Sequence, residues 1–257
     1  MSSDKPPITK DNLLTYIKEL AKDFRKLNGT ATTAEIILIG GAAVLASYGF
    51  REMTYDIDAV IVASSAMKQA INRVGDKYDL PNGWLNADFK QTASYSSKLS
   101  EVSRYYKTFS NILTVRVVAA EYLLAMKLMS GRLYKYDMSD IIGILWEHQK
   151  SGEPITRDMI DGAVTKLYGE NAVISENPLA LLNAVMRTDD YESLYGQVRK
   201  SESESKEFLL KFDEQYPDAL KSDNINDILS RRKQKDGERN DFLATLDGLK
   251  KAADDEW

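Results

Sequence analysis

The chain has 257 residues, of which 43% are hydrophobic and 28% are charged, which is an ordinary composition for a globular protein. It contains no cysteine and a single histidine, His148, which excludes disulfides, thiol catalysis and metal sites built from cysteine or several histidines. The longest apolar run, residues 36–48, has 13 residues, fewer than the about 20 that cross a bilayer. Residues 1–9 lack the apolar core of a secretory signal. We therefore expect a cytoplasmic protein without a membrane partner.

Charge is distributed unevenly along the chain. Residues 1–150 carry a net charge of +3, and residues 151–257 carry a net charge of −8. The mildly basic half suits an anionic ligand, whereas the acidic half does not suit DNA.

Hydrophobic spacing predicts the secondary structure. A period of three to four residues predicts helices at residues 10–27, 42–48, 64–78, 120–132 and 137–149, and almost continuous helix from residue 156, including a charge-rich stretch at 202–255. Runs of β-branched residues predict strands at residues 35–39, 56–63, 104–109 and 112–118, with a turn at Ser110-Asn111. We expect Asp11 or Asn12 to cap the first helix, Ser64 or Ser65 to cap the third, and Trp84 to anchor the loop at 79–89 in the core.

The order of these elements predicts the fold class. The strands lie within residues 35–118 and the helices dominate afterwards, which indicates an α+β fold. A break near Ser151-Gly152 divides the chain into an N-terminal domain, residues 1–150, and a helical C-terminal domain, residues 151–257.

Residues 36–62 carry the candidate chemistry. A strand runs into Gly40-Gly41, a short helix follows, and a second strand begins with Asp56-Ile57-Asp58. Because alternate residues of a strand face the same side, we expect the two carboxylates side by side, roughly 6–7 Å apart along the strand. Two like charges this close favour a cation between them, and oxygen ligands suit Mg²⁺, which takes its other ligands from water and phosphates.

The glycine turn supplies groups that bind such phosphates. Glycines let the backbone approach phosphate oxygens, and the helix that follows, expected to open at Ala42, points its free N–H groups at them. Arg51 and Thr54 directly precede the acidic pair and are placed to reach the same ligand.

This order of motifs resembles the nucleotidyltransferase superfamily, whose pattern is a Gly-Gly or Gly-Ser turn followed by an acidic pair. The R-x-x-T-x-D-I-D stretch that ends at Asp58 looks like that of AbiEii-type toxins of abortive-infection systems. A later helix with Lys127, followed by Arg132, Asp137 and Asp140, is similar to their helical lysine and D-x-x-D motifs. The resemblance covers roughly residues 35–145 and implies a nucleotidyltransferase-like mixed sheet.

The resemblance also implies a reaction: transfer of a nucleoside monophosphate from an NTP to an acceptor hydroxyl of a tRNA, a protein or a small molecule. Asp56 and Asp58 would bind Mg²⁺ or Mn²⁺, Gly40 and Gly41 would bind phosphates, and Lys127 would neutralise the β and γ oxygens. Asp137 and Asp140 would position Lys127 or the acceptor. The same resemblance implies a toxin of a toxin–antitoxin or phage-defence system, with a cognate antitoxin as its partner.

The sequence departs from the family pattern at the third carboxylate. The strand at 112–118, where the family places that residue, carries Arg116 and no acid. Asp88 is the nearest acidic substitute, and Glu101 is another. The alternative is therefore a catalytically degenerate nucleotide-binding or protein-interaction module. Each candidate also has a plain structural alternative: a solvated strand end for the acidic pair, a strand-to-helix turn for the two glycines, a surface position for Lys127 and helix capping for Asp137 and Asp140.

Overall fold

The computed structural model describes residues 6–132, 135–221, 224–225 and 227–229. The chain forms two compact units, one made of residues 2–126 and 158–172, the other of residues 127–157 and the chain from residue 173 onward. The domain boundary near residue 150 stays a prediction, because compactness does not measure independent folding. Much of the charge-rich stretch at 202–255 lies outside the described residues.

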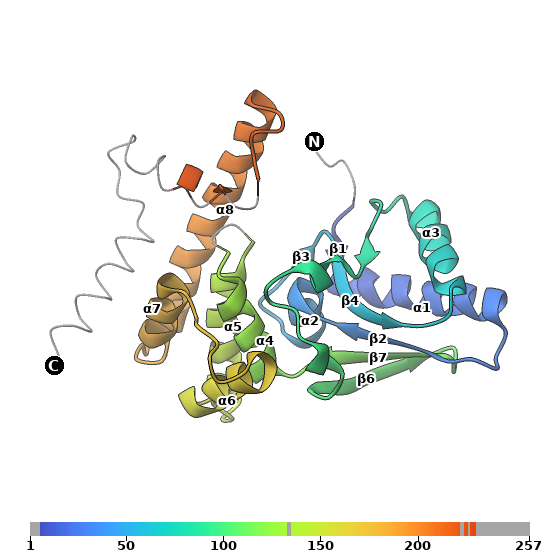
Figure 1. Ribbon diagram of the computed structural model, residues 1–257, viewed down its shortest axis with the longest axis horizontal. Helices are drawn as coiled ribbons and strands as arrows, with labels where there is room; N and C mark the ends of the chain where they lie inside the picture. Colours follow the sequence, from blue (N-terminus) through green and yellow to red (C-terminus); the bar gives the residue numbers. More distant parts are fainter. Residues whose placement is uncertain (1–5, 133–134, 222–223, 226, 230–257) are drawn as a thin grey trace, which may run out of the picture. The chain divides into compact units, whose positions relative to one another are not determined.

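The first unit is built on a mixed five-stranded sheet with the order β5-β4-β2-β7-β6 (Figure 1). The central strand β2 is parallel to β7 and antiparallel to β4, while β5 is parallel to β4 and β6 is antiparallel to β7. The strands are β2 (Ala34–Leu38), β4 (Ile57–Val62), β5 (Leu85–Asn86), β6 (Ser103–Phe109) and β7 (Leu113–Val118). The predicted hairpin is confirmed: Ser110 and Asn111 have φ of 51° and 53°, the backbone that a tight β6–β7 turn requires.

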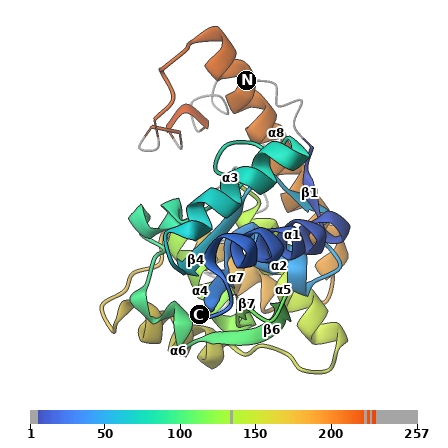
Figure 2. The same ribbon diagram turned by 90° about the vertical axis from the view of Figure 1, so that its right-hand side faces the viewer.

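The helices of this unit bury apolar stripes. They are α1 (Lys10–Asn28), α2 (Gly40–Ser47), α3 (Ala66–Tyr78), α4 (Ala120–Ser130), of which residues 127–130 belong to the second unit, and α6 (Arg157–Tyr168). Two short 3₁₀ helices, η1 (Asp88–Gln91) and η2 (Ser97–Ser100), lie between β5 and β6. Helices α1 and α3 lie side by side (Figure 2). The predicted Trp84 anchor is confirmed, since its side chain is 2% exposed and its Nε1 donates to the Ile71 carbonyl at 3.1 Å.

A second, two-stranded sheet pairs β1 (Ile8–Thr9) with β3 (Met53–Thr54). Because β1 runs directly into α1, the N-cap of α1 is Thr9, and the prediction of Asp11 or Asn12 is wrong. Asn12 instead completes a capping box: its side chain accepts from the Thr9 N–H at 2.8 Å, and the Thr9 hydroxyl accepts from the Asn12 N–H at 3.4 Å.

Two further helix ends differ from the prediction. Helix α2 begins at Gly40 rather than Ala42, because Gly40 has a φ of +54° that turns the chain straight from the strand into the helix. It ends at Ser47, with an extended Tyr48 as its C-cap, before Gly49. Ser65 occupies the N-cap position of α3 but makes no capping bond, while the Ser64 hydroxyl donates to the Asn28 side chain at 2.6 Å.

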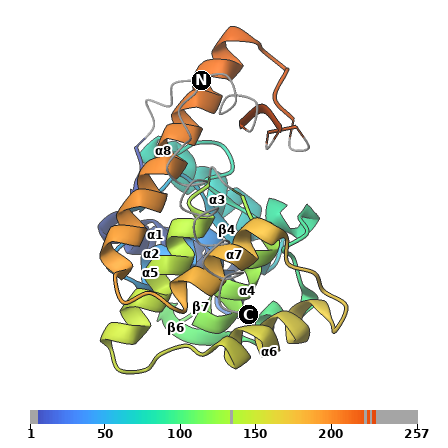
Figure 3. The same ribbon diagram turned by 90° about the vertical axis from the view of Figure 1, so that its left-hand side faces the viewer.

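The second unit is helical. Helix α5 (Asp137–Lys150) packs against both α7 (Glu176–Val185) and α8 (Tyr191–Gln215) (Figure 3). Its apolar side is fully buried at Ile141, Ile142 and Ile144. His148 lies in the last turn of α5 and is partly buried, whereas we expected an exposed helix-end residue. The mixed sheet followed by helices confirms the α+β class. Within the described residues, no helix combines the length and apolar character needed to cross a membrane.

Candidate functional site

The glycine turn and the acidic strand meet at one edge of the sheet. The β2–β4 ladder pairs Leu38 with Ala59, and the Ile39 N–H donates to the Asp58 carbonyl at 3.1 Å. This register places the start of β4 beside the start of α2. A Cβ built on Gly40 would lie 3.6 Å from Oδ2 of Asp58, so the carboxylate is a direct neighbour of the turn.

Arg51 and Thr54 close the other side of the turn. A Cβ on Gly41 would lie 2.7 Å from Nη2 of Arg51 and 3.0 Å from Oγ1 of Thr54, distances at which one of the groups must move. Glycine at position 41 is therefore what allows both side chains to approach the backbone. Arg51 is only 8% exposed, and its Nε donates to the Met53 carbonyl at 3.2 Å, which fixes the guanidinium there.

Helix α2 begins at this cluster. The first turn of a helix has no intrahelical acceptors for its N–H groups, and the aligned peptide dipoles leave partial positive charge there. Ile39, the N-cap residue, provides no side-chain capping bond. Together with the Arg51 guanidinium, this helix start has the chemistry of an anion site, and Asp58 borders it.

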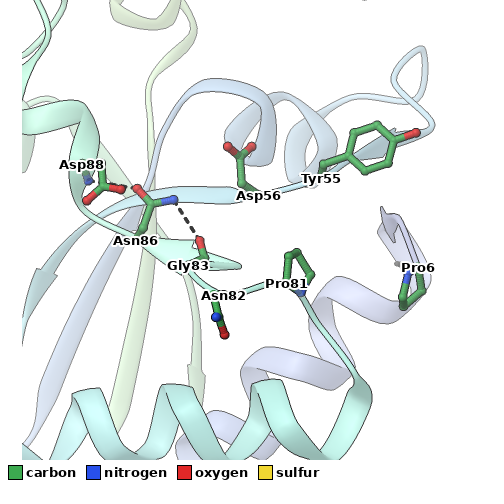
Figure 4. A pocket seen from close by; sticks show the side chains of 8 residues that line it. All are labelled: Pro6, Tyr55, Asp56, Pro81, Asn82, Gly83, Asn86 and Asp88. Atoms are coloured by element: carbon green, nitrogen blue, oxygen red, sulfur yellow. Dashed lines mark hydrogen bonds between the residues drawn. The ribbon is translucent and has the colours of Figure 1, made fainter. Parts of the chain in front are cut away.

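Asp56 lies two residues before Asp58 and belongs to the same edge. The Thr54 hydroxyl donates to the Asp56 carbonyl at 3.1 Å, which links the acid to the residues around Gly41. Asp56 also lines a pocket of about 340 Å³ (Figure 4). The other lining residues are Pro6, Tyr55, Pro81, Asn82, Gly83, Asn86 and Asp88.

Asp88, the substitute predicted for the third carboxylate, lines the same pocket as Asp56. The Asn86 side chain holds this part of the loop: its Nδ2 donates to the Gly83 carbonyl at 3.1 Å, and its Oδ1 accepts from the Asp88 N–H at 2.9 Å. Asn86 also pairs with Asp58 in the β4–β5 ladder. Glu101 follows η2 and is not among the residues that line the pocket.

Arg116 occupies the strand position where the family pattern has an acid. Its Nε donates to the Ser103 hydroxyl at 2.8 Å, and Glu35 lies 4.0 Å away. These contacts tie β7 to its neighbouring strands β6 and β2. Among the described residues, no group of three or more histidines, cysteines, aspartates or glutamates is arranged to hold a metal.

Lys127, Asp137 and Asp140 form a buried cluster in the second unit. The Lys127 Nζ lies 3.0 Å from Oδ1 of Asp137 and 2.7 Å from Oδ2 of Asp140, and all three residues are at most 4% exposed. Oδ2 of Asp137 also accepts from Ser130 Oγ at 3.0 Å and Arg132 Nε at 2.9 Å. Both aspartates thus contact Lys127 directly. They are also the first-turn acids of α5, so the structural role proposed as their alternative is present as well.

The charges of this cluster and the burial of its members shift the pKa values of two carboxyl groups. Burial alone would raise the pKa of Asp137, but Lys127 and Arg132 outweigh it, and the pKa is lowered to about 2. Glu202 on α8 shows the opposite shift. Burial, the largest cause, together with the charges of Asp140 and Asp137, raises the pKa of Glu202 to about 8, although hydrogen bonds from Ser139 and Met138 oppose the change.

Sequence reasoning missed Glu202, Ser130 and Asn86. Glu202 lies in a Ser-Glu-Ser-Glu-Ser run that is typical of a solvated helix face. The sequence did contain a signal that this position is buried, because Glu202 falls in the stripe of α8 formed by Leu194, Val198 and Leu209, all of which are buried. An acid inside an apolar stripe indicates a buried carboxyl group with a specific partner.

The mixed sheet, the glycine turn and the acids at the start of β4 together define a nucleotidyltransferase-like domain. The model of the family described as nucleotidyltransferase of unknown function (DUF6036) matches residues 15–150, just over half of the chain. The chain belongs to this family. No curated protein matches the chain, and no solved structure matches it. The match supports the nucleotidyltransferase superfamily predicted from the sequence and, with it, nucleotidyl transfer as the general activity; it does not support the AbiEii-like branch.

Proposed function

We propose that this chain is a metal-dependent nucleotidyltransferase that moves a nucleoside monophosphate from an NTP to an acceptor hydroxyl. In this reaction the acceptor oxygen forms a bond to the α-phosphorus, the bond to the β-phosphate oxygen breaks, and pyrophosphate leaves with the electron pair. The acceptor proton passes to a base. The observation that carries the proposal is the convergence of Asp58, Arg51 and Thr54 on the Gly40-Gly41 turn.

Each group of the cluster has a proposed task. The backbone N–H groups at Gly41 and the Arg51 guanidinium bind phosphate oxygens, and Thr54 holds the loop that carries Asp56. Asp56 and Asp58 would hold Mg²⁺ or Mn²⁺. When bound, such an ion neutralises triphosphate charge and lowers the pKa of the attacking hydroxyl.

Two further residues complete the proposal. Lys127 would neutralise the β and γ oxygens as a point charge, as the resemblance to the nucleotidyltransferase superfamily implies. Asp88 would accept the acceptor proton, and its support is that it lines the pocket that Asp56 also lines. The candidate acceptors are tRNA, proteins and small molecules with free hydroxyl groups.

The test is label transfer. The protein is incubated with each α-labelled NTP, Mg²⁺ or Mn²⁺, and fractions of tRNA, protein and small molecules. We expect label on one fraction, and loss of at least about a hundredfold in rate on Asp56→Asn or Asp58→Asn, because each removes a charge that the transition state needs. Asp76→Asn, an exposed acid on α3, is the matched control. Transfer that is equally fast in the Asp58→Asn variant would overturn the proposal.

A biological role is proposed from the R-x-x-T-x-D-I-D stretch and its resemblance to AbiEii-type toxins. On this proposal the protein is a toxin of a toxin–antitoxin or phage-defence system, and its partner is a cognate antitoxin. Induced expression should then arrest growth, and Asp58→Asn should abolish the arrest. Arrest that persists in this variant would exclude a role for nucleotidyl transfer in toxicity.

The second candidate is a module that binds nucleotides or a protein without catalysis. Arg116 in place of a strand acid is the observation that favours it, because no third carboxylate then stands on β7. Calorimetry separates the two candidates. Tight NTP binding without any label transfer supports the second candidate, and turnover contradicts it.

A further inference from the structure

The pocket that Asp56 lines is built entirely from the first unit. Tyr55 and Asp56 come from the segment before β4, Pro6 comes from the segment before β1, and the other lining residues come from the loop around β5 (Figure 4). All of them lie within residues 2–126, so the pocket is complete within one compact unit. Its volume of about 340 Å³ is at the small end of ligand sites, which suits a small molecule or a single terminal group.

The lining of this pocket is rich in hydrogen-bond acceptors and poor in donors. It contains the carboxylates of Asp56 and Asp88 and the carboxamides of Asn82 and Asn86, and none of the described residues that line it is a lysine, arginine or histidine. Its two prolines have no backbone N–H to donate. Because a phosphate group needs cations or N–H donors, the pocket does not suit a phosphorylated group. An ammonium group, which has only donors and a positive charge, is complementary to this lining.

The guanidinium of Arg51 belongs to the glycine turn and not to the pocket. A Cβ built on Gly41 would lie 2.7 Å from Nη2 of Arg51, and Arg51 is not among the residues that line the pocket. The Thr54 hydroxyl joins the two regions, because it lies beside Gly41 and donates to the Asp56 carbonyl at 3.1 Å. On the proposed function the turn binds the anionic triphosphate, which leaves the pocket for the second substrate.

The position of Asp88 points to the same use of the pocket. On the proposed function Asp88 removes the proton of the acceptor hydroxyl, and a base must lie within hydrogen-bond reach of the proton that it removes. The hydroxyl therefore enters the pocket that Asp88 lines. The Asn86 side chain fixes this part of the loop, since its Oδ1 accepts from the Asp88 N–H at 2.9 Å, and Asn86 itself pairs with Asp58 in the β4–β5 ladder.

We propose that this pocket is the acceptor subsite and that the acceptor is a small molecule with both a hydroxyl and an ammonium group. The inference rests on the proposed function and narrows its three classes of acceptor to one. The ammonium group binds the carboxylate and carboxamide oxygens, beside the ring of Tyr55, which is 45% exposed. The ammonium has no lone pair, so the hydroxyl oxygen forms the bond to the α-phosphorus, its proton passes to Asp88, and pyrophosphate leaves with the electron pair of the broken bond.

The first experiment sorts acceptors by charge. The small molecules of a cell extract are separated by ion exchange into cationic, neutral and anionic pools. Each pool is incubated with the wild-type protein, α-labelled NTPs and Mg²⁺ or Mn²⁺, beside fractions of tRNA and protein. Label should appear in the cationic pool. Label confined to any other fraction overturns the inference and leaves the proposed function standing, whereas no label in any fraction overturns both.

The second experiment tests whether the acceptor binds in the pocket. Asn82→Lys adds a positive charge at an exposed lining residue, and it should weaken binding of the acceptor purified from the cationic pool by at least about tenfold. Calorimetry without NTP or metal measures this affinity. Asn82→Asp should bind the acceptor at least as tightly as the wild type. Asn72→Lys, at an exposed position of α3 that does not line the pocket, is the matched control.

Two results of the second experiment contradict the inference. Equal acceptor affinity of Asn82→Lys and Asn72→Lys indicates that the acceptor binds elsewhere. Weaker NTP binding by Asn82→Lys, with unchanged acceptor binding, assigns the pocket to the nucleoside instead. Because Asn82 is exposed, the variant should unfold at the same temperature as the wild type, and a thermal unfolding curve checks this.

Discussion

The buried Glu202 predicts an unusual dependence of stability on pH. Its pKa in the folded protein is raised to about 8 from an ordinary value of 4.5. The folded state therefore binds a proton more tightly than the unfolded state between these two values. The stabilisation is fully present below pH 4.5, and it is lost as the pH rises through 8.

The size of the effect follows from the shift. One pKa unit corresponds to about 1.4 kcal/mol, and the pKa rises from 4.5 to about 8, so the full change is about 5 kcal/mol. The free energy of unfolding should fall by about 1 kcal/mol per pH unit between pH 5.5 and 7.5. Asp137 does not contribute in this window, because its pKa is lowered to about 2 and its stabilisation is lost only as the pH falls toward that value.

Urea unfolding of the wild-type protein and Glu202→Gln at pH 5.5, 6.5 and 7.5 measures the effect. The wild-type protein should lose stability across the series, and Glu202→Gln should show a much flatter profile because its amide does not titrate. Carbon NMR of the labelled glutamate carboxyl groups measures the pKa directly. A wild-type stability that is constant or rises over this range, with no change on Glu202→Gln, would refute the reasoning.

Three further predictions concern the site and the core. Gly41→Ala should weaken NTP binding by at least about tenfold, because its Cβ would displace Arg51 and Thr54. The control Gly162→Ala, whose Cβ would meet nothing within 4 Å, should bind NTP like the wild type. Calorimetry measures both affinities, and equal affinity of the two variants would contradict the geometry. Trp84→Ala should lower the free energy of unfolding by about 3–5 kcal/mol, measured in urea, and a loss below about 1 kcal/mol would show that the anchor is unimportant. Thr9→Ala should cost about 1 kcal/mol through loss of the capping box, and an unchanged melting temperature would contradict that role.

Local chemistry explains which parts of the fold could be predicted. The four longer strands β2, β4, β6 and β7, the Ser110-Asn111 turn and the long helices follow from hydrophobic period and turn residues, which act over a few neighbours. The two-residue strands β1, β3 and β5 were not predicted, because so short a segment has no period of its own. The helix starts were less predictable. Thr9 became a cap because β1 pairs with β3, and Gly40 became the first residue of α2 because of its positive φ. Both depend on tertiary pairing or backbone geometry that a short window of sequence does not contain.

The candidate site shows the same division. The turn at Gly40-Gly41 and the acid Asp58 were predicted together, because the strand–turn–helix–strand order brings adjacent segments to one edge. Asp88 was predicted only as the nearest acidic substitute for the third carboxylate of the family pattern, and it lines a pocket together with Asp56. Glu202 could not be predicted as the partner of α5, because helix–helix packing sets that contact and the residues are more than 60 positions apart in sequence.

Metal-dependent binding of an NTP tests the central claim most directly. The dissociation constant of the preferred NTP is measured by calorimetry with Mg²⁺ and with excess chelator, for the wild-type protein and for the double variant Asp56→Asn, Asp58→Asn. The account predicts that Mg²⁺ tightens binding to the wild-type protein by at least about tenfold and has little effect on the double variant. An equal response to Mg²⁺ in both proteins would contradict it.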